Sequence, residues 1–345
     1  MTMTDVPAVV QVPVKDLEHH TRLALEVLGY SPDESSIIER ILLYAQLRGN
    51  TQGVVKLVTK SLDKHPLSST KPIAVERNSP TTASVDGNQH CGMLVLQYAT
   101  DLAISKASQG GVSVVTCRNY ATSTGAIGFY AQEIARHGLI GLVFSGSPEL
   151  VAPHGGTQPL FGTNPIAIAF PRNDRDTPLV MDLATSAISY FAVILAKLAK
   201  QAIPANVAID CQGKPTTDPS AVHAILPFGG HKGSALALVV ELFSNALAGG
   251  AIHDKDNAND WASCVMAVDP TRFHADLNAF TARVEQILGR VKSNPPITPG
   301  AALWLPGERG NSVYHQHVTQ GTIDMDASLW QQLQDFTSAK KTSRL

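Results

Sequence analysis

The sequence predicts an α/β or mixed α+β protein. Helical and strand-like patterns alternate along all 345 residues, which is typical of chains whose helices pack on a central sheet. Hydrophobic residues make up 44% of the chain and charged residues 16%, so it can bury a large core. No G-x-G-x-x-G follows a predicted strand, because Gly110-Gly111 and Gly229-Gly230 have the wrong spacing. A Rossmann dinucleotide site is therefore not predicted.

The first half of the chain is expected to alternate between helices and strands. Apolar spacing predicts a helix over residues 15–29. Ser31, Pro32 and Glu34 form an N-terminal capping pattern for a second helix that ends near Gly49. Residues 60–80 are rich in Ser, Pro and Lys and are expected to form a connecting segment between regular elements. The following elements are a strand over 82–85, a helix over 92–108, a strand over 112–117, a helix over 126–136 and a strand over 139–144.

The second half continues the mixture. An alternating apolar run ends at Pro171, and a second strand pattern covers Pro178 to Ser186. The remaining expected elements are helices over 187–201, 233–248, 274–290 and 327–338, and strands over 207–210 and 262–269.

Bulk properties exclude several protein classes. The formal net charge is −2, from 27 basic and 29 acidic residues, so nucleic-acid binding is not expected. No apolar run approaches the ~18 residues of a membrane span, and the first residues do not resemble a signal peptide. A cytoplasmic protein is expected. Four scattered cysteines form no metal or dithiol pattern, and Cys117 and Cys264 are expected to be buried thiols.

Two neighbouring segments could carry a binding site. Gly155–Pro171 contains a glycine-rich loop, Gly-Thr-Asn-Pro and the apolar run. Glycine serves tight turns and close ligand approach alike, so both interpretations are open. Asp182 ends the next strand pattern, where it could simply cap a helix.

Two further short segments could contact a ligand, and the first of them precedes an apolar helical pattern. Lys232 in His231-Lys232-Gly233 would oppose the helix dipole unless it met an anion or remained in solvent. Pro306-Gly307-Glu308-Arg309 taken alone is only a turn.

Taken together, these motifs resemble the non-Rossmann malate/L-lactate dehydrogenase family, which includes ureidoglycolate dehydrogenase, 2,3-diketogulonate reductase and piperideine/pyrroline-2-carboxylate reductase. The resemblance extends from about residue 15 to about residue 335. It implies a helical domain from residues 1–78 and 235–345 and a mixed-sheet NAD(P)-binding domain over 79–234. It also implies a homodimer that binds NAD(P)H and acts on a small carboxylate.

The resemblance assigns roles to individual positions. Thr51, Lys56 and Thr163 would bind the substrate. The residues expected to contact the cofactor are Ser147, Asp182, Leu183, Ala184, His231, Lys232, Gly307, Glu308 and Arg309. His90 and His154 lie near the glycine-rich elements and are further candidates for the pocket wall.

The chain departs from the family where catalysis would occur. Relatives carry Ser-His-Gly-x-x-Arg, with the histidine as acid/base and the arginine on the substrate carboxylate. Here Thr51, Gln52 and Lys56 occupy the matching positions, and Ser123 replaces a second family histidine. Glutamine does not titrate, and lysine lacks the guanidinium fork. The expected catalytic residues are Gln52, Lys56, Ser123 and Asp182.

Three interpretations follow. Another group could donate the proton, namely Lys56, His231 or a water held by Gln52 and Ser123. The substrate could be a cyclic imine carboxylate, which is protonated before reduction. The chain could also be a nucleotide-binding homologue without turnover.

Overall fold

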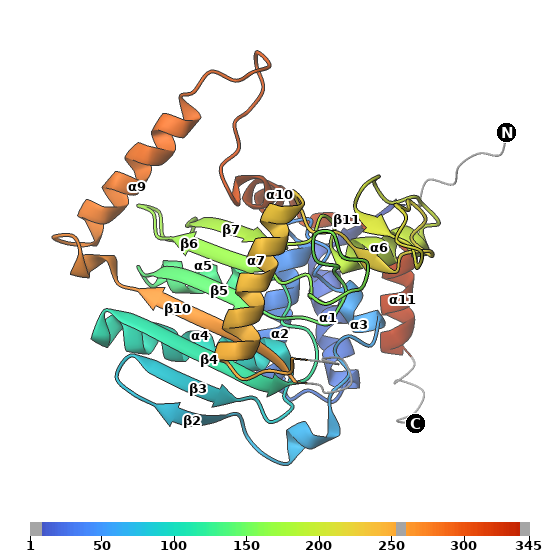
Figure 1. Ribbon diagram of the computed structural model, residues 1–345, viewed down its shortest axis with the longest axis horizontal. Coiled ribbons are helices and arrows are strands. Elements are labelled where there is room, and N and C mark those ends of the chain that lie inside the picture. The colour runs from blue at the N-terminus through green and yellow to red at the C-terminus, as the bar shows by residue number, and fades with distance from the viewer. Residues whose placement is uncertain (1–8, 253–259, 339–345) are drawn as a thin grey trace.

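A seven-stranded mixed sheet lies at the centre of the computed structural model, which describes residues 9–252 and 260–338 (Figure 1). The strand order is β2-β3-β4-β10-β5-β6-β7. Only the β3–β4 pair is parallel, and all other neighbours in this sheet are antiparallel. The strands are β2 (Ala74–Asn78), β3 (Thr82–Asp86), β4 (Val112–Tyr120), β5 (Ile140–Ser145), β6 (Ile166–Phe170), β7 (Leu179–Leu183) and β10 (Trp261–Val268).

Both faces of this sheet are covered by helices. Helices α4 (Gly92–Gly110) and α5 (Gly128–Arg136) pack on one face, in a core that includes Val143 and Val265. The alternate residues Leu142 and Cys264 face the other side. There they pack with α7 (His231–Glu241) and its π-helical continuation η2 (Leu242–Leu247). Alternation along each strand thus supplies two apolar faces, as expected for a sheet between two helical layers.

The two ends of the chain meet beside the sheet. Strand β1 (Val9–Pro13) pairs with β11 (Thr322–Asp326), and α1 (Val14–Val27) packs against α11 (Ala327–Ser338). Helix α2 (Pro32–Gln46) begins with the expected capping box. The Glu34 N–H donates to Ser31 Oγ (3.3 Å), and the Ser31 N–H donates to Glu34 Oε2 (2.8 Å).

The sheet also receives strands from segments that the sequence assigned to the helical portion. Strand β10 comes from residues 235–345, yet it lies between β4 and β5. Strand β2 comes from residues 1–78 and forms one edge. The chain thus returns to the sheet after α7.

Several shorter elements complete the molecule. They are α3 (Val55–Val58), η1 (Pro66–Ser69), α6 (Tyr190–Leu198), β8 (Ala208–Ile209), β9 (Ala224–Ile225), η3 (Pro270–Arg272), α9 (Leu277–Lys292) and α10 (Glu308–Gln320). Helix α9 and the chain that follows it extend away from the sheet (Figure 1). Within the described ranges, every helix is too short or too polar to cross a membrane.

Candidate active site

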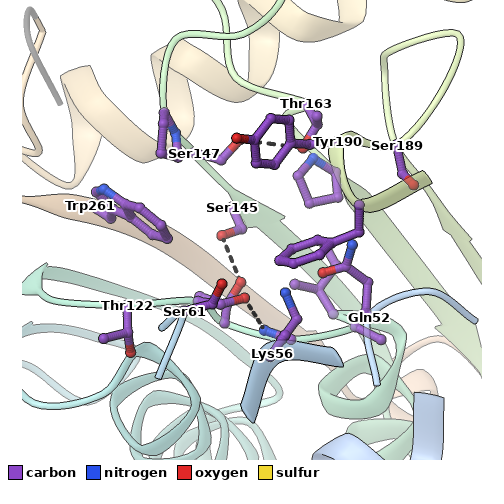
Figure 2. Close-up of a pocket in the computed structure, with 18 of the residues that line it drawn as sticks. Gln52, Lys56, Ser61, Thr122, Ser145, Ser147, Thr163, Ser189, Tyr190 and Trp261 are labelled. Carbon is purple, nitrogen blue, oxygen red and sulfur yellow. Dashed lines mark hydrogen bonds between the residues drawn. The ribbon is translucent and has the colours of Figure 1, made fainter. Parts of the chain in front are cut away.

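A pocket of about 580 Å³ lies where the sheet meets the helical portion. Its size falls within the usual range for small-molecule sites. Figure 2 shows Gln52, Lys56, Ser145 and Trp261 around this space. The wall is made by segments of residues 50–65, 121–127, 145–150, 163–165, 182–184 and 189–191, together with Trp261.

The pocket brings most of the sequence-predicted site residues together. Those that line it are Thr51, Gln52, Lys56, Ser123, Ser147, Thr163, Asp182, Leu183 and Ala184. They come from segments far apart in the chain, so only the fold could assemble them. His231, Lys232, Gly307, Glu308 and Arg309 do not line it.

Lys56 forms part of the pocket floor. Its side chain is 0% exposed, and Nζ has no hydrogen-bond partner among the described residues. The ammonium lies 3.7 Å from the centre of the Phe191 ring, in a cation–π contact. Burial without a counter-charge lowers the pKa of Lys56 to about 7. The amine therefore changes charge near neutral pH and is covered by an aromatic ring.

The start of α6 holds Phe191 above the lysine. Ser189 caps this helix by accepting a hydrogen bond from the Ala192 N–H (3.1 Å). The Ser189 hydroxyl also lies 3.2 Å from that of Thr51, which joins α6 to the loop before Lys56. The sequence predicted this helix but gave no signal for the contact between Phe191 and Lys56.

Gln52 and Ser123 occupy the wall near Lys56. The Gln52 N–H donates to Asn50 Oδ1 (2.9 Å), which fixes the loop and leaves the Gln52 side chain in the pocket wall. Ser123 Oγ accepts a hydrogen bond from the Gly125 N–H (3.1 Å). Neither side chain titrates near neutral pH, so they can supply hydrogen bonds but not acid/base chemistry.

Asp182 lies near the end of β7, opposite the start of α5. Its carboxylate accepts a hydrogen bond from the Gly128 N–H (2.9 Å). Asp182 is exposed by its accessible surface, which opens to the pocket, while the protein packed around the carboxylate desolvates it. This desolvation outweighs the hydrogen bond and raises the pKa of Asp182 to about 6.

Hydroxyl groups line the sheet side of the pocket. Ser147 Oγ lies 3.3 Å from Thr163 Oγ1. Ser145 Oγ lies 3.4 Å from Thr124 Oγ1 and accepts from Ser263 Oγ (3.0 Å). Ser145 and Thr124 were not predicted from the sequence, because a single Ser or Thr in an apolar strand carries no motif.

The Gly-Thr-Asn-Pro motif has a structural role beside this wall. Buried Asn164 donates through Nδ2 to the Ala237 carbonyl (3.1 Å) and to Glu241 Oε1 (2.8 Å), which ties the loop to α7. Its backbone has a φ of 38°, a left-handed conformation that asparagine tolerates. The motif thus positions Thr163 in the pocket wall.

We expect Gly162→Ala to destabilise this loop. The added Cβ would lie 2.5 Å from the Ser147 carbonyl oxygen and 2.6 Å from Asn164 Oδ1. Backbone must then shift, at a cost of about 1–3 kcal/mol. Thermal unfolding followed by circular dichroism should show a lower midpoint. Gly289→Ala on α9 is the control, because its Cβ would meet nothing within 4 Å, and it should leave the midpoint equal or higher. Equal midpoints for both variants would contradict this packing.

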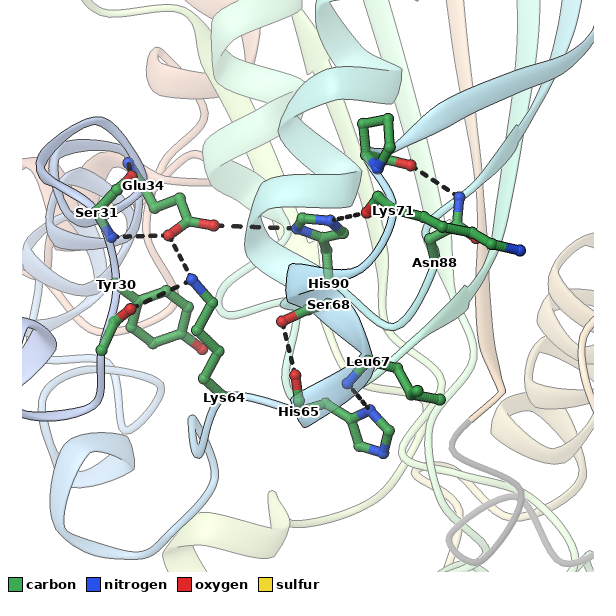
Figure 3. Close-up of polar contacts among 12 residues, drawn as sticks. Tyr30, Ser31, Glu34, Lys64, His65, Leu67, Ser68, Lys71, Asn88 and His90 are labelled. Carbon is green, nitrogen blue, oxygen red and sulfur yellow. Dashed lines mark hydrogen bonds and ion pairs between the residues drawn. The ribbon is translucent and has the colours of Figure 1, made fainter.

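The outer wall of the pocket is a loop fastened to α2 and α4. Lys64 Nζ donates to Glu34 Oε2 (2.8 Å), and His90 Nε2 lies 2.8 Å from the Lys71 carbonyl oxygen (Figure 3). His90 Nδ1 is 4.0 Å from Glu34 Oε1. His90 therefore holds the loop and does not line the pocket, while His65 on the same loop does.

The other expected cofactor residues lie outside the pocket. His231 and Lys232 are exposed at the start of α7, where the His231 and His154 rings are 6.2 Å apart. Glu308 forms an ion pair with Lys292 (2.6 Å) and accepts from the Leu305 N–H (2.9 Å). Gly307, Arg309 and His154 are likewise absent from the lining.

Both of these helix starts nevertheless lie at or just beyond the strand that carries Asp182. A Cβ on Gly307 would lie 2.9 Å from the Val180 carbonyl oxygen, and one on Gly233 would lie 2.9 Å from that of Thr185. The N-terminus of α10 thus lies against β7, and that of α7 lies against Thr185, two residues after this strand ends.

The chemistry of the pocket fits a small anion beside a planar aromatic group. One buried cation, the carboxyl groups of Asp63 and Asp182, and several hydroxyls line a space bordered by Phe191 and Trp261. No group of three or more His, Cys, Asp or Glu side chains that could hold a metal ion is found in residues 9–252 and 260–338.

The sequence matches the malate/L-lactate dehydrogenase family over residues 12–334. It is 33% identical over 331 residues to L-sulfolactate dehydrogenase of Methanothermobacter thermautotrophicus, covering 92% of this chain and 94% of that protein. It is 35% identical over 325 residues to delta(1)-pyrroline-2-carboxylate reductase 1 of Burkholderia ambifaria, covering 89% and 93%.

The fold is also similar to solved structures. A dehydrogenase from Sinorhizobium meliloti superimposes with a TM-score of 0.86 at 29% identity, covering 96% of this chain and 99% of that one. The similarity spans the sheet and the helical portion together, so the expected non-Rossmann mixed fold is confirmed.

Proposed function

Because the chain belongs to the malate/L-lactate dehydrogenase family and is an oxidoreductase acting on CH–OH or C=N groups, we propose that it interconverts a small 2-oxo acid and the 2-hydroxy acid with NAD(P)H. Family dehydrogenases use nicotinamide cofactors. The relatives quoted above are named for the small carboxylates sulfolactate and pyrroline-2-carboxylate.

The unpartnered ammonium of Lys56 is the observation that carries this proposal. A buried cation is costly without a counter-charge, and none of the described residues provides one within hydrogen-bond distance. A substrate carboxylate would supply it. Thr51 and Thr163 would border the same substrate from the pocket wall.

We assign the cofactor to the side of the pocket formed by Asp182, Leu183, Ala184 and Ser147. When bound there, the reduced nicotinamide supplies a hydride. The remainder of the cofactor would extend along β7 toward the starts of α7 and α10, where His231, Lys232, Gly307, Glu308 and Arg309 lie. Helix N-termini suit phosphate groups because their N–H groups point outward.

Gln52 is assigned to the reacting oxygen or nitrogen. Its amide can donate a hydrogen bond that polarises a carbonyl. Ser123 would hold a water or the substrate from the neighbouring wall. These roles need no titratable side chain at either position.

A second candidate function is reduction of a cyclic imine carboxylate. It is favoured by Gln52 and Ser123, because an imine that is protonated before reduction needs no acid from the protein. The Burkholderia ambifaria relative is named for such a substrate. The carboxylate would meet Lys56 in both cases.

The proposal is tested by titrating the protein with NADH and NADPH and following absorbance at 340 nm with pyruvate, oxaloacetate, 3-sulfopyruvate and pyrroline-2-carboxylate. Turnover of an oxo acid supports the first function. Turnover of the imine alone supports the second. Cofactor binding without turnover of any of the four would indicate a non-catalytic nucleotide-binding protein.

We further propose a homodimer formed through α7. The outer side of α7 and the start of η2 expose Leu238, Val239 and Leu242 at 49%, 40% and 54%, which is unusual for a surface in water. Leu238→Asp should convert a dimer to a monomer in size-exclusion chromatography with light scattering. Leu67→Asp, at an exposed position on η1, is the control. A monomeric native protein would contradict the proposal.

A further inference from the structure

In the candidate site, Lys56 and Gln52 occupy the positions that would bind the substrate carboxylate and supply the proton. The proposed reduction needs a cation for the substrate carboxylate and a proton for the carbonyl oxygen, which becomes the hydroxyl group of the product. Lys56 is the buried cation of the pocket, and Gln52 and Ser123 cannot release a proton near neutral pH. One side chain must therefore serve twice, or the proton must come from elsewhere.

Resting on the proposed function, we propose that Lys56 both binds the carboxylate of a 2-oxo acid and donates the proton to its carbonyl oxygen. In a 2-oxo acid the carbonyl oxygen and one carboxylate oxygen can lie on the same side of the bond that joins them. An ammonium group has three N–H donors, so it can reach both oxygens at once. An arginine could bind the carboxylate but would not give up a proton.

The other titratable side chains of the pocket are less suited to this role. His65 Nδ1 accepts a hydrogen bond from the Leu67 N–H (3.3 Å), and His65 lies at the margin shared with a second cavity. The carboxylate of Asp182, on β7, already accepts a hydrogen bond from the Gly128 N–H. Lys60 and Asp63 belong to the outer loop, and Tyr190, the first residue of α6, is 41% exposed. The buried thiol of Cys91 is the group that acts electrostatically on Lys56, and burial raises the pKa of this thiol, so it brings no negative charge.

The proton balance of the step is complete. As carbon 2 accepts the hydride, the π electrons of the C=O bond move to oxygen. An O–H bond then forms while one N–H bond of Lys56 breaks, which leaves a neutral amine. Solvent returns the proton after the product leaves. A cyclic iminium needs no such donor, because it is protonated before reduction.

The Phe191 ring contributes to the burial of the Lys56 amine. The ring covers Nζ in the structure, and Lys56 is 0% exposed, so the ring must turn aside when a substrate binds. Burial lowers the pKa of Lys56 to about 7 before substrate binds, and the Phe191 ring is part of the protein that covers Nζ. Phe191 is thus a positioning residue that acts through Lys56.

The kinetic test compares Lys56→Arg with Gln52→His/Lys56→Arg. Lys56→Arg keeps the charge but cannot donate, so kcat for the oxo acid should fall about 10²–10⁴-fold, while KM changes less. Adding Gln52→His supplies a group that titrates near neutral pH and should restore kcat. Lys197→Arg, exposed on the same helix as Phe191, is the matched control. A Lys56→Arg variant with native kcat, or loss of activity in His65→Gln instead, would overturn the inference while leaving the proposed function intact.

Proton uptake provides a readout without turnover. Oxamate, an unreactive analogue of a 2-oxo acid, should protonate neutral Lys56 when it binds. Calorimetry at pH 8 in two buffers of different ionisation enthalpy should show this uptake in the native protein and none in Lys56→Arg. Phe191→Ala should reduce the uptake and move the pH profile of kcat/KM upward, because the amine becomes hydrated. Oxamate binding without proton uptake would refute the role of Lys56. Failure of oxamate to bind would count against the proposed function itself.

Discussion

Replacing Lys56 by methionine is expected to abolish reduction of a 2-oxo acid and to make the protein more stable. Activity should fall by at least about 10²–10⁴-fold, because carboxylate binding and proton donation are both lost. Stability should rise, because methionine fills the same space without burying an unpaired charge. Comparable replacements of buried charges stabilise by about 1–4 kcal/mol.

The stability gain should depend on pH in a defined direction. The pKa of Lys56 is about 7 in the folded protein and about 10.4 when unfolded. Between these values the unfolded state binds more protons, so the contribution of Lys56 to stability improves as pH rises. The advantage of Lys56→Met should thus be largest below pH 7 and shrink toward pH 10. Thermal unfolding at pH 6.5 and 9 checks this, with Lys197→Met as control. A lower midpoint for Lys56→Met at pH 6.5 would contradict the account.

Replacing Asp182 by alanine is expected to weaken cofactor binding. Asp182 lines the pocket on the side assigned to the cofactor and accepts from the Gly128 N–H. We expect the bound cofactor to donate a hydrogen bond to this carboxylate; losing a charge-assisted hydrogen bond costs about 1.5–3 kcal/mol, so the Kd for NAD(P)H should rise about 10–150-fold. Fluorescence quenching can report the binding, because Trp261 lines the same pocket.

The Asp182 carboxyl should also make cofactor binding depend on pH. Its pKa is raised to about 6, so it becomes protonated as pH falls below 6 and accepts hydrogen bonds less well. Native affinity should therefore drop between pH 7 and pH 5, and the affinity of Asp182→Ala should not. Asp16→Ala on α1 is the control. Equal Kd values for native protein and Asp182→Ala would contradict the assignment.

Local sequence rules predicted the elements whose signals lie within a few residues. The capping box at Ser31 was identified, and α4 ends at Gly110, close to the expected end at 108, and is followed by Gly111 with a φ of 83°. Strand β2 was taken for a connection because it is a polar strand at the sheet edge. Helix α10 has no buried residue and so lacks an apolar face. Because α10 lacks the apolar periodicity of a packed helix, the sequence did not predict it.

The site was predictable to the extent that it follows family motifs. The motifs located Gln52, Lys56 and Asp182, which the fold brings into one pocket. They could not reveal that Phe191 covers Lys56, because that contact joins α3 to α6 through the fold. The burial that lowers the pKa of Lys56 is also a product of the whole fold, so it is likewise invisible in the sequence.

The most direct test of the central claim is to follow the transferred hydrogen. The native protein is incubated with NADH or NADPH carrying deuterium on carbon 4 of the nicotinamide and with the oxo-acid panel, and the products are examined by mass spectrometry. The account predicts one deuterium on carbon 2 of a 2-hydroxy acid. A reduced product without deuterium at carbon 2, or no reduced product from any oxo acid, would contradict it.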